Sequence, residues 1–293
     1  MARVSLRQLE YFVAVAEIGS FRRAAEVLYV AQPSLSSQIG MLEHEIGGAL
    51  LNRHARGVSL TPAGRIFLRE AKTTLASVDR AVRHSRLALE GSAGEIHFAT
   101  VHSIAAGLVP RALTAWRSDR PGALATMQEF RSATELERST AMGLHDFAIG
   151  PLPDADFAHL EPLGAEEFVI VLPGGDEALA SPVVNLAELA RRPWVLFRKE
   201  HGLSIVMDTI FALHGIHPSG AVFTSQTDVA VNLAIAGLGP TIVPSNVVPE
   251  HLSGFCRSFE KPYMRELFVY SMNPKTSLAD GFIQCFKDVL AGR

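Results

Sequence analysis

The chain has 293 residues, of which 48% are hydrophobic, and it carries a formal net charge of −3. This length exceeds one average domain, so we expect two or three domains with separate cores. No apolar run reaches the roughly 18 residues that a transmembrane helix needs, and charged side chains interrupt the N-terminus where a signal peptide has its apolar core. We therefore expect a cytoplasmic protein without a membrane partner.

Residues 5–43 predict three short helices around one core. Small alanines on the inward face of the second helix let another helix cross closely. The third helix begins near Pro33, whose missing N–H suits a first helical turn. Apolar residues recur at helical spacing, and they are Leu6, Leu9, Phe12, Val13 and Ala16 in the first helix, Ala24, Ala25 and Leu28 in the second, and Leu35, Ile39 and Leu42 in the third.

The third helix leaves a set of short, neutral polar side chains exposed. Such side chains suit base edges and phosphate oxygens when they lie at the N-terminal end of a DNA recognition helix. Gln38 has the amide needed for a two-hydrogen-bond contact with adenine. An ordinary helical hairpin with a polar surface would show the same pattern, so this segment alone leaves both interpretations open. The exposed residues are Gln32, Ser34, Ser36, Ser37 and Gln38.

Residues 52–61 are a basic, glycine-containing stretch between apolar residues, a pattern that predicts a two-stranded wing able to lie along a phosphate backbone. The wing and the three helices together make a winged helix-turn-helix. The charge distribution agrees with this, because residues 1–90 carry a net charge of +4 and residues 91–293 a net charge of −7. A basic head on an acidic body places the attraction for nucleic acid at the motif.

Pro62 begins a segment that contains no further Pro or Gly until Gly91, apart from Gly64 in its first turn. This predicts one long helix. Its narrow apolar seam is typical of two helices packed side by side, and a helix folded against its own chain is the alternative. We infer a homodimer that presents two heads to two DNA half-sites. The seam consists of Leu68, Ala71, Leu75, Val78, Val82, Ser85 and Leu89.

A hinge is predicted at residues 91–94, and beyond it strands alternate with helices, which implies a largely parallel sheet. The predicted strands are 95–101, 124–130, 146–150, 167–172, 194–198, 221–224, 240–243, 254–259 and 266–272. The predicted helices are 104–118, 132–143, 185–190, 203–214, 227–236 and 277–290. Cys256 and Cys285 lie far apart and lack metal-ligand partners at motif spacing, so we read both as packing residues and leave a redox role open.

In such sheets, ligands bind outside the carboxyl ends of the strands, where helix N-termini direct N–H groups at an anion. The residues at these places include three cations, which favour a carboxylate or another anionic metabolite. Taken singly, each Ser or Thr also reads as a helix cap and each cation as a surface group. The candidate effector-binding residues are His102, Ser103, Arg131, Ser132, Phe197, Arg198, Lys199, Leu203 and Thr227.

Many spaced motifs match one known family. They are 9–12, 19–21, 24–25, 32–36, 38–39, 42–43, Gly47, 50–51, Arg53 and 60–64 in the head, and 107–110, 146–150 and 237–244 further along. On these residues the chain resembles a LysR-type transcriptional regulator, specifically over residues 5–64 and more weakly over the rest. Ser37 and Gly40 depart from the family, which often has Arg or Lys there. This departure implies weaker phosphate contacts or more reliance on Arg22, Arg23 and the wing.

The resemblance implies an α+β multidomain chain with a winged helix-turn-helix domain (1–61), a linker and dimerisation helix (62–90), and a periplasmic-binding-protein-like effector domain (91–293). The effector domain would have two α/β lobes with a small-molecule cleft between them. The first lobe would comprise 92–161 and 267–293, and the second 162–266. Family positions that line the cleft match Ser103, Ser132, Leu203 and Thr227. The resemblance also implies a dimer of dimers, and RNA polymerase is a candidate partner.

On this hypothesis the paired heads bind double-stranded promoter DNA, and the effector changes how they hold it. The candidate DNA-binding residues are Ser20, Arg22, Gln32, Pro33, Ser34, Ser36, Ser37, Gln38, Arg53 and Arg56. The usual enzyme motifs are missing from the sequence, so we expect a regulator that is not an enzyme and needs no cofactor or metal. Two rivals stay open: a solute-binding module with an accessory helical head, and an oligomeric DNA-bundling protein.

Overall fold

The computed structural model describes residues 4–54, 57–89 and 94–292. Arg56 and most of the expected hinge therefore lie outside the described residues. The chain forms two compact units, one of residues 1–89 with 142–144, and one of residues 90–141 with 145–293. Within the described ranges, no helix combines the length and the apolar character needed to cross a bilayer.

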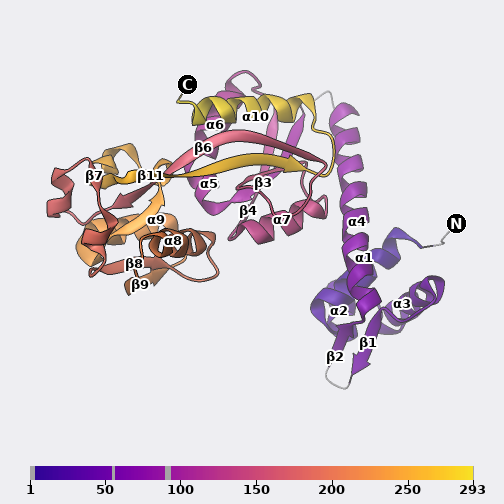
Figure 1. Cartoon of the computed structure of the whole chain (residues 1–293). Helices are drawn as coiled ribbons and strands as arrows, with labels where there is room; N and C mark the ends of the chain where they lie inside the picture. The colour runs from indigo at the N-terminus through magenta and orange to yellow at the C-terminus, as the bar shows by residue number, and fades with distance from the viewer. Residues whose placement is uncertain (1–3, 55–56, 90–93, 293) are drawn as a thin grey trace. The chain divides into compact units, whose positions relative to one another are not determined.

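The head contains the predicted three helices and two-stranded wing (Figure 1). Ser5 caps the first helix in a capping box with Gln8, and Ser20 caps the second. The third has Pro33 in its first turn and ends at Gly47, whose φ of 82° is a left-handed conformation that glycine adopts readily. The elements are α1 (Leu6–Ile18), α2 (Phe21–Val27), α3 (Gln32–Ile46), β1 (Leu51–His54) and β2 (Gly57–Leu60).

The core of the head forms where the helical spacing predicts it, except that a different face of α1 is buried. Leu35, Ile39 and Leu42 are fully buried, which confirms the inward face of α3. In α1, Leu6 is 43% exposed, whereas Tyr11 and Val15, which the spacing did not select, are buried. The buried face of α1 is therefore rotated relative to the predicted one, away from Leu6 and toward Tyr11 and Val15.

The long helix α4 (Pro62–Leu89) confirms the prediction of one uninterrupted helix. The first part of its apolar seam packs against its own head: Ala71 is buried in the core of the head, and Leu68 and Leu75 pack against that core. Val82 and Ser85, further along the seam, are exposed. Packing against the same chain thus accounts for the first half of the seam, and the exposed part of the second half is what a partner helix can still cover.

The second unit contains one seven-stranded sheet in the order β10-β6-β11-β5-β3-β4, with β7 paired to β11, and a separate parallel pair β8-β9. The strands are β3 (Glu95–Val101), β4 (Leu124–Phe130), β5 (Phe147–Gly150), β6 (His159–Val171), β7 (Val183–Val184), β8 (Pro193–Phe197), β9 (Ser219–Thr224), β10 (Thr241–Pro244) and β11 (Cys256–Ser271).

The prediction of a largely parallel sheet is wrong for the seven-stranded sheet. β3 pairs in parallel with β4 and β5, but β6 runs antiparallel to β10 and β11, and β11 runs antiparallel to β5. A parallel neighbour needs a crossover connection, usually through a helix, and only loops or short 3₁₀ turns directly precede β6 and β11. The two predicted strands 254–259 and 266–272 are also one strand, β11, with a register shift between Ser258 and Tyr263.

Helices flank these strands, and two of the predicted helices differ from the structure. The expected helix 104–118 is two helices that begin at His102, and the expected helix 185–190 is a 3₁₀ turn at Leu186–Leu189. The last helix occupies its predicted range. The α-helices are α5 (His102–Gly107), α6 (Val109–Ser118), α7 (Ala133–Ala141), α8 (Gly202–Leu213), α9 (Thr227–Leu233, continued by a π turn at Ala234–Leu238) and α10 (Ser277–Leu290).

Two hydrophobic cores make the second unit two-lobed. The core of the first lobe includes Phe98, Trp116 and Phe282, and the core of the second includes Phe168 and Trp194. Strands β6 and β11 lie side by side and run from one lobe into the other (Figure 1). Because each strand contributes residues to both cores, the lobes are joined by a pair of hydrogen-bonded strands.

Candidate DNA-binding and effector-binding sites

The polar residues predicted to face DNA lie at the start of α3. Gln32, Ser34 and Ser37 are exposed, and Ser36 and Gln38 are partly exposed. Helix α3 has no side-chain cap, so the free N–H groups of its first turn accompany these side chains. The face therefore offers short donors and acceptors together with the positive end of a helix dipole.

Arg53 of β1 joins the wing to this face. Its Nη1 donates to the Ser36 Oγ at 3.1 Å, and its guanidinium lies 4.7 Å from the centre of the Phe21 ring. Arg22 is largely exposed beside Glu26, with 3.7 Å between the charged atoms. Ser20 is already engaged, because its Oγ accepts the Arg23 N–H at 3.4 Å. The structure thus brings Arg53 and Ser36 together and gives Ser20 a structural contact at the start of α2.

A cavity of about 200 Å³ lies between the two lobes of the second unit. The first lobe lines it with residues that follow β3 and β4, and the second lobe lines it with the start of α8, while Arg265 reaches it from β11. Among the predicted effector-binding residues, this wall contains His102, Ser103, Arg131, Ser132 and Leu203.

The four remaining candidates lie elsewhere. Phe197 is 3% exposed and belongs to the core of the second lobe. Thr227 lines a second cavity of about 490 Å³, and Arg198 lines a third of about 310 Å³. Lys199 is exposed and is absent from the walls of all three cavities. Five of the nine residues selected by the carboxyl-end rule therefore line the cavity between the lobes, and the other four do not.

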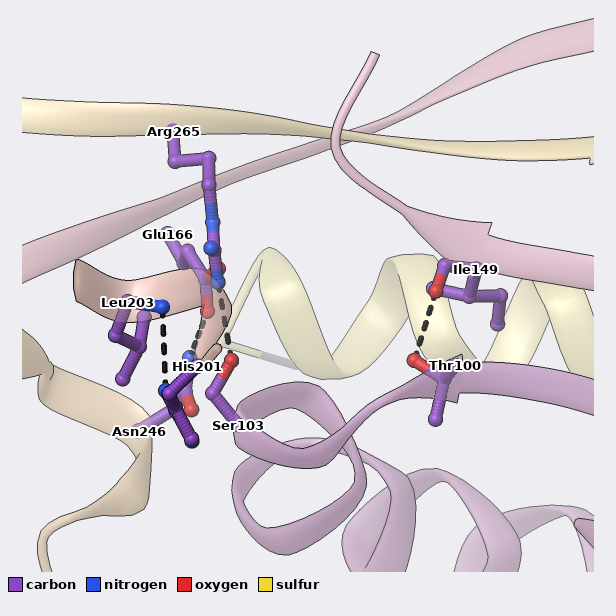
Figure 2. A network of polar contacts seen from close by, with 8 residues as sticks. All are labelled: Thr100, Ser103, Ile149, Glu166, His201, Leu203, Asn246 and Arg265. Atoms are coloured by element: carbon purple, nitrogen blue, oxygen red, sulfur yellow. Dashed lines mark hydrogen bonds and ion pairs between the residues drawn. The ribbon is translucent and has the colours of Figure 1, made fainter. Parts of the chain in front are cut away.

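A buried polar network supports the floor of the cavity (Figure 2). Glu166 of β6 is 3% exposed and accepts hydrogen bonds from the Arg265 Nε at 2.6 Å and the Asn246 Nδ2 at 2.5 Å. The Arg265 Nη2 also forms an ion pair with Glu166 and donates to the Ser103 Oγ at 3.2 Å. The Arg265 guanidinium lies 5.0 Å from the centre of the Phe168 ring. The network ties both connecting strands to the start of α5.

His201, which also lines this cavity, caps the N-terminus of α8. Its Nδ1 accepts the Leu203 N–H at 3.2 Å, and its ring stacks on Phe197 with 4.6 Å between ring centres (Figure 2 shows the cap). The next residue, Gly202, donates its N–H to the Arg131 carbonyl of the first lobe at 2.8 Å. A Cβ at Gly202 would lie 3.2 Å from that oxygen, so glycine permits this close approach of the lobes.

Burial, together with a smaller contribution from neighbouring His102, lowers the pKa of His201 from 6.5 to about 4. The ring is therefore neutral near pH 7. Arg131 and Glu200 line cavities together with His201, and Glu129 lies 4.0 Å from His102. The desolvated ring thus sits among charged groups without carrying a charge of its own.

This lowered pKa predicts a pH dependence of stability. Between pH 6.5 and 4 the unfolded chain binds a proton at His201 and the folded chain does not, so stability falls as the pH falls through this window. The loss reaches about 3 kcal/mol at most. Urea unfolding from pH 7.5 to 4.5 measures it, with His201→Asn as the comparison, because Asn keeps a capping oxygen but does not titrate. An equally steep pH dependence in the variant would contradict the assignment to His201.

The sequence did not select His201, Arg265 or Glu166. His201 lies two residues before the predicted helix 203–214, and a capping position would have been a signal for it. Arg265 lies between two predicted strands that are one strand in the structure, and Glu166 precedes the predicted strand 167–172. Both residues were missed because the predicted strands were shorter than β6 and β11, the two strands that connect the lobes.

The cysteines lie in separate environments. Cys256 packs against the core of the second lobe and Cys285 against that of the first, as packing residues. Burial raises the pKa of the Cys256 thiol to about 11 and also raises that of Cys285. Both thiols are therefore protonated near pH 7, which disfavours the thiolate that redox chemistry requires.

Comparison with known proteins matches two family models. The bacterial regulatory helix-turn-helix model of the lysR family covers residues 6–65, and the LysR substrate binding domain covers residues 89–291. The chain belongs to the LysR family of bacterial transcriptional regulators. As a LysR-type regulator it has the expected fold class: a helix-turn-helix head and a two-lobed effector-binding domain.

Named relatives agree with this family. The chain is 34% identical to the uncharacterized HTH-type transcriptional regulator YnfL of Escherichia coli (strain K12), over 83% of each chain. It is 29% identical to the HTH-type transcriptional regulator TfdS of Cupriavidus pinatubonensis, over 94% of this chain and 91% of the relative. These names confirm the prediction of a regulator and not an enzyme.

The fold of the whole LysR-type chain also matches solved structures. The crystal structure of CbnR, a LysR family transcriptional regulator, superposes with a TM-score of 0.71 at 22% identity, covering 97% of this chain and 98% of CbnR. Full-length CbnR complexed with its target DNA gives a TM-score of 0.69 at 22% identity, covering 97% of this chain and 99% of that one.

Proposed function

We propose that this LysR-type regulator binds a small organic anion in the cavity between its lobes and that binding changes how paired heads hold promoter DNA. The observation that carries the proposal is the charge on the cavity wall. Arg131 and Arg265 line the wall, and none of its described lining residues is Asp or Glu. A wall with cations and no carboxylate favours an anionic ligand.

The two arginines do not contribute equally. Arg265 is neutralised by Glu166 behind it, whereas Arg131 has no ion pair among the residues that the structure describes. The uncompensated charge of Arg131 matches a ligand with one anionic group. Apolar side chains such as Val101, Ile205 and Val206 make up much of the rest of the wall. The cavity therefore suits a ligand with an apolar body and one anionic end.

Replacing Arg131 by alanine should weaken ligand binding about tenfold or more and spare DNA binding, because a charge-assisted hydrogen bond is lost. Ser132→Ala should have a smaller effect in the same direction. The measurement is a thermal-shift titration of the full-length protein with carboxylic acids, amino acids, aromatic acids and sugar phosphates. Arg191→Ala is the control, since Arg191 is an exposed cation of the second lobe away from these cavities. If neither cavity variant changed the response, the cavity would not be the effector site.

For DNA we propose that two heads joined through α4 bind the halves of an interrupted palindrome, and that two such dimers assemble into a tetramer. The exposed seam residues Val82 and Ser85 of α4 support the dimer, and the DNA complex of CbnR supports duplex binding by this type of head. Gln32, Ser34, Ser36 and Gln38 would face bases. The positively charged contacts would be Arg22, Arg53 and Arg56, mostly to phosphates.

Alanine at Ser34 or Gln38 should weaken operator binding about tenfold without unfolding the head, because the polar contact is lost while the buried face of α3 stays intact. Fluorescence anisotropy with a labelled fragment from upstream of the reading frame measures the affinity. His44→Ala provides the control, because His44 is an exposed residue near the other end of α3. Unchanged affinity in both variants would place the base contacts elsewhere.

Ligand binding can switch the complex only if the ligand prefers one arrangement of the lobes. A difference of about 1 to 3 kcal/mol between the two arrangements would suffice, and bending or altered spacing of the DNA would report it. DNA footprinting with and without the ligand tests this step. A footprint that ignores every ligand would favour a DNA-bundling protein, and no footprint at all would favour a solute-binding module.

A further inference from the structure

One ring nitrogen of His201, a residue that lines the cavity, has no hydrogen-bond partner among the described residues. His201 is 4% exposed, and its Nε2 is buried without a partner among the described residues. Nearly all buried polar atoms in proteins are paired, so an unpaired one at a ligand cavity needs an explanation. The same residue lines the cavity between the lobes and both neighbouring cavities.

The cap on α8 determines where the proton of this ring lies. The Leu203 N–H can only donate, and it points at the His201 Nδ1, which must therefore present its lone pair. A neutral imidazole carries one hydrogen, and here that hydrogen belongs to Nε2. The stacking on Phe197 fixes the plane of the ring. His201 is thus an uncharged donor whose position and direction are set by the protein.

We propose that the Nε2–H of His201 donates a hydrogen bond to an oxygen of the bound effector, while Arg131 holds the effector's anionic group. This rests on the proposed function, in which the cavity between the lobes takes a small organic anion. The effector then needs an oxygen acceptor on the side of the second lobe, and its negative charge is still matched by Arg131, which has no ion pair within the described part of the chain. Its contacts with both lobes would favour the arrangement in which the lobes approach each other.

The donor adds selectivity that a charged group would not. A ligand that presents only apolar atoms or donors to His201 leaves the N–H unpaired, as it is without ligand, and so lacks the hydrogen bond that an acceptor gains there. A carboxylate whose second oxygen reaches His201 satisfies it. The proposal therefore separates acids that can present an oxygen to both lobes from amines and hydrocarbons of the same size.

The first test is the tautomer. Long-range ¹H–¹⁵N correlation spectra of the full-length protein with ¹⁵N-labelled histidine, recorded at pH 7, should show His201 with its proton on Nε2. His201→Asn identifies the signal by its loss and keeps an oxygen that can cap α8. His201→Ser, which also retains a capping oxygen, serves if the Asn variant does not fold. A proton on Nδ1, or a doubly protonated ring, would overturn the proposal without any ligand.

The second test uses sodium benzoate and sodium hexanoate as probes, each an apolar body with one carboxylate. We expect at least one to stabilise the wild-type protein thermally, to shift the Nε2 proton signal, and to bind about tenfold more weakly to the His201 variants. Equal affinity for wild type and variants would overturn the role of His201 and leave the anion cavity intact. If neither probe stabilised the wild type, the proposed class of ligand would fail, and this inference with it.

Discussion

Replacing Glu166 by alanine should lower the free energy of unfolding of the effector domain by about 3 to 5 kcal/mol. Its carboxylate is almost completely buried and accepts hydrogen bonds from Arg265 and Asn246. Removing it leaves the Arg265 guanidinium, whose side chain is only 12% exposed, without a counter-charge. An uncompensated buried cation lowers the free energy of unfolding by much more than the intact ion pair raises it.

Urea unfolding followed by circular dichroism measures this loss. The matched control is the double variant Glu166→Leu with Arg265→Met, which removes both charges and fills similar space. We expect the double variant to recover most of the stability, because a buried ion pair and a hydrophobic pair are often close in free energy. A loss below about 1 kcal/mol for Glu166→Ala would mean that water or another group already shields Arg265.

Leu35→Ala should destabilise the head by about 3 to 5 kcal/mol and abolish operator binding, while the cavity still binds ligand. Leu35 is fully buried between α3 and the rest of the head core, so truncation leaves a cavity under the helix that presents the predicted base-facing residues. Thermal unfolding and DNA titration together measure the two effects. The head and the effector domain are separate compact units, which is why ligand binding should persist.

Met41→Ala is the matched control for this change. Met41 lies on the same helix and is 55% exposed, so its truncation should change stability by less than about 0.5 kcal/mol. If Leu35→Ala bound the operator as tightly as the control variant, α3 would not be the helix that reads DNA. If both variants unfolded the head, the exposed face of α3 would be part of a further packing surface.

The sequence predicts the parts of the fold that depend on local patterns. The head follows from helical spacing over short segments, and β4 and α10 occupy their predicted ranges. The connecting strands β6 and β11 were predicted too short because Pro162, Gly164 and Pro262 interrupt them with signals typical of turns. These strands are held by their long-range pairing with each other, which no local pattern reveals.

The same limit applies to the candidate site. Ser103, Arg131 and Leu203 could be selected because ends of strands and starts of helices are visible in the sequence. Arg265 and Glu166 could not, since their meeting depends on the register between β6 and β11, where Arg265 lies opposite Glu166. Pairing between residues so far apart in the chain is set by the assembled sheet.

The first lobe is built from two stretches of chain that are synthesised at different times. Its strands β3 and β4 leave the ribosome early, but its core also needs Phe282 and Phe286 of α10, which are made last. The core of the second lobe is built from residues between Phe168 and Tyr263, so translation completes it before it reaches α10. A premature stop codon just before α10 would therefore yield a polypeptide that has all the core residues of the second lobe. Its first lobe would lack the α10 side chains that complete the core.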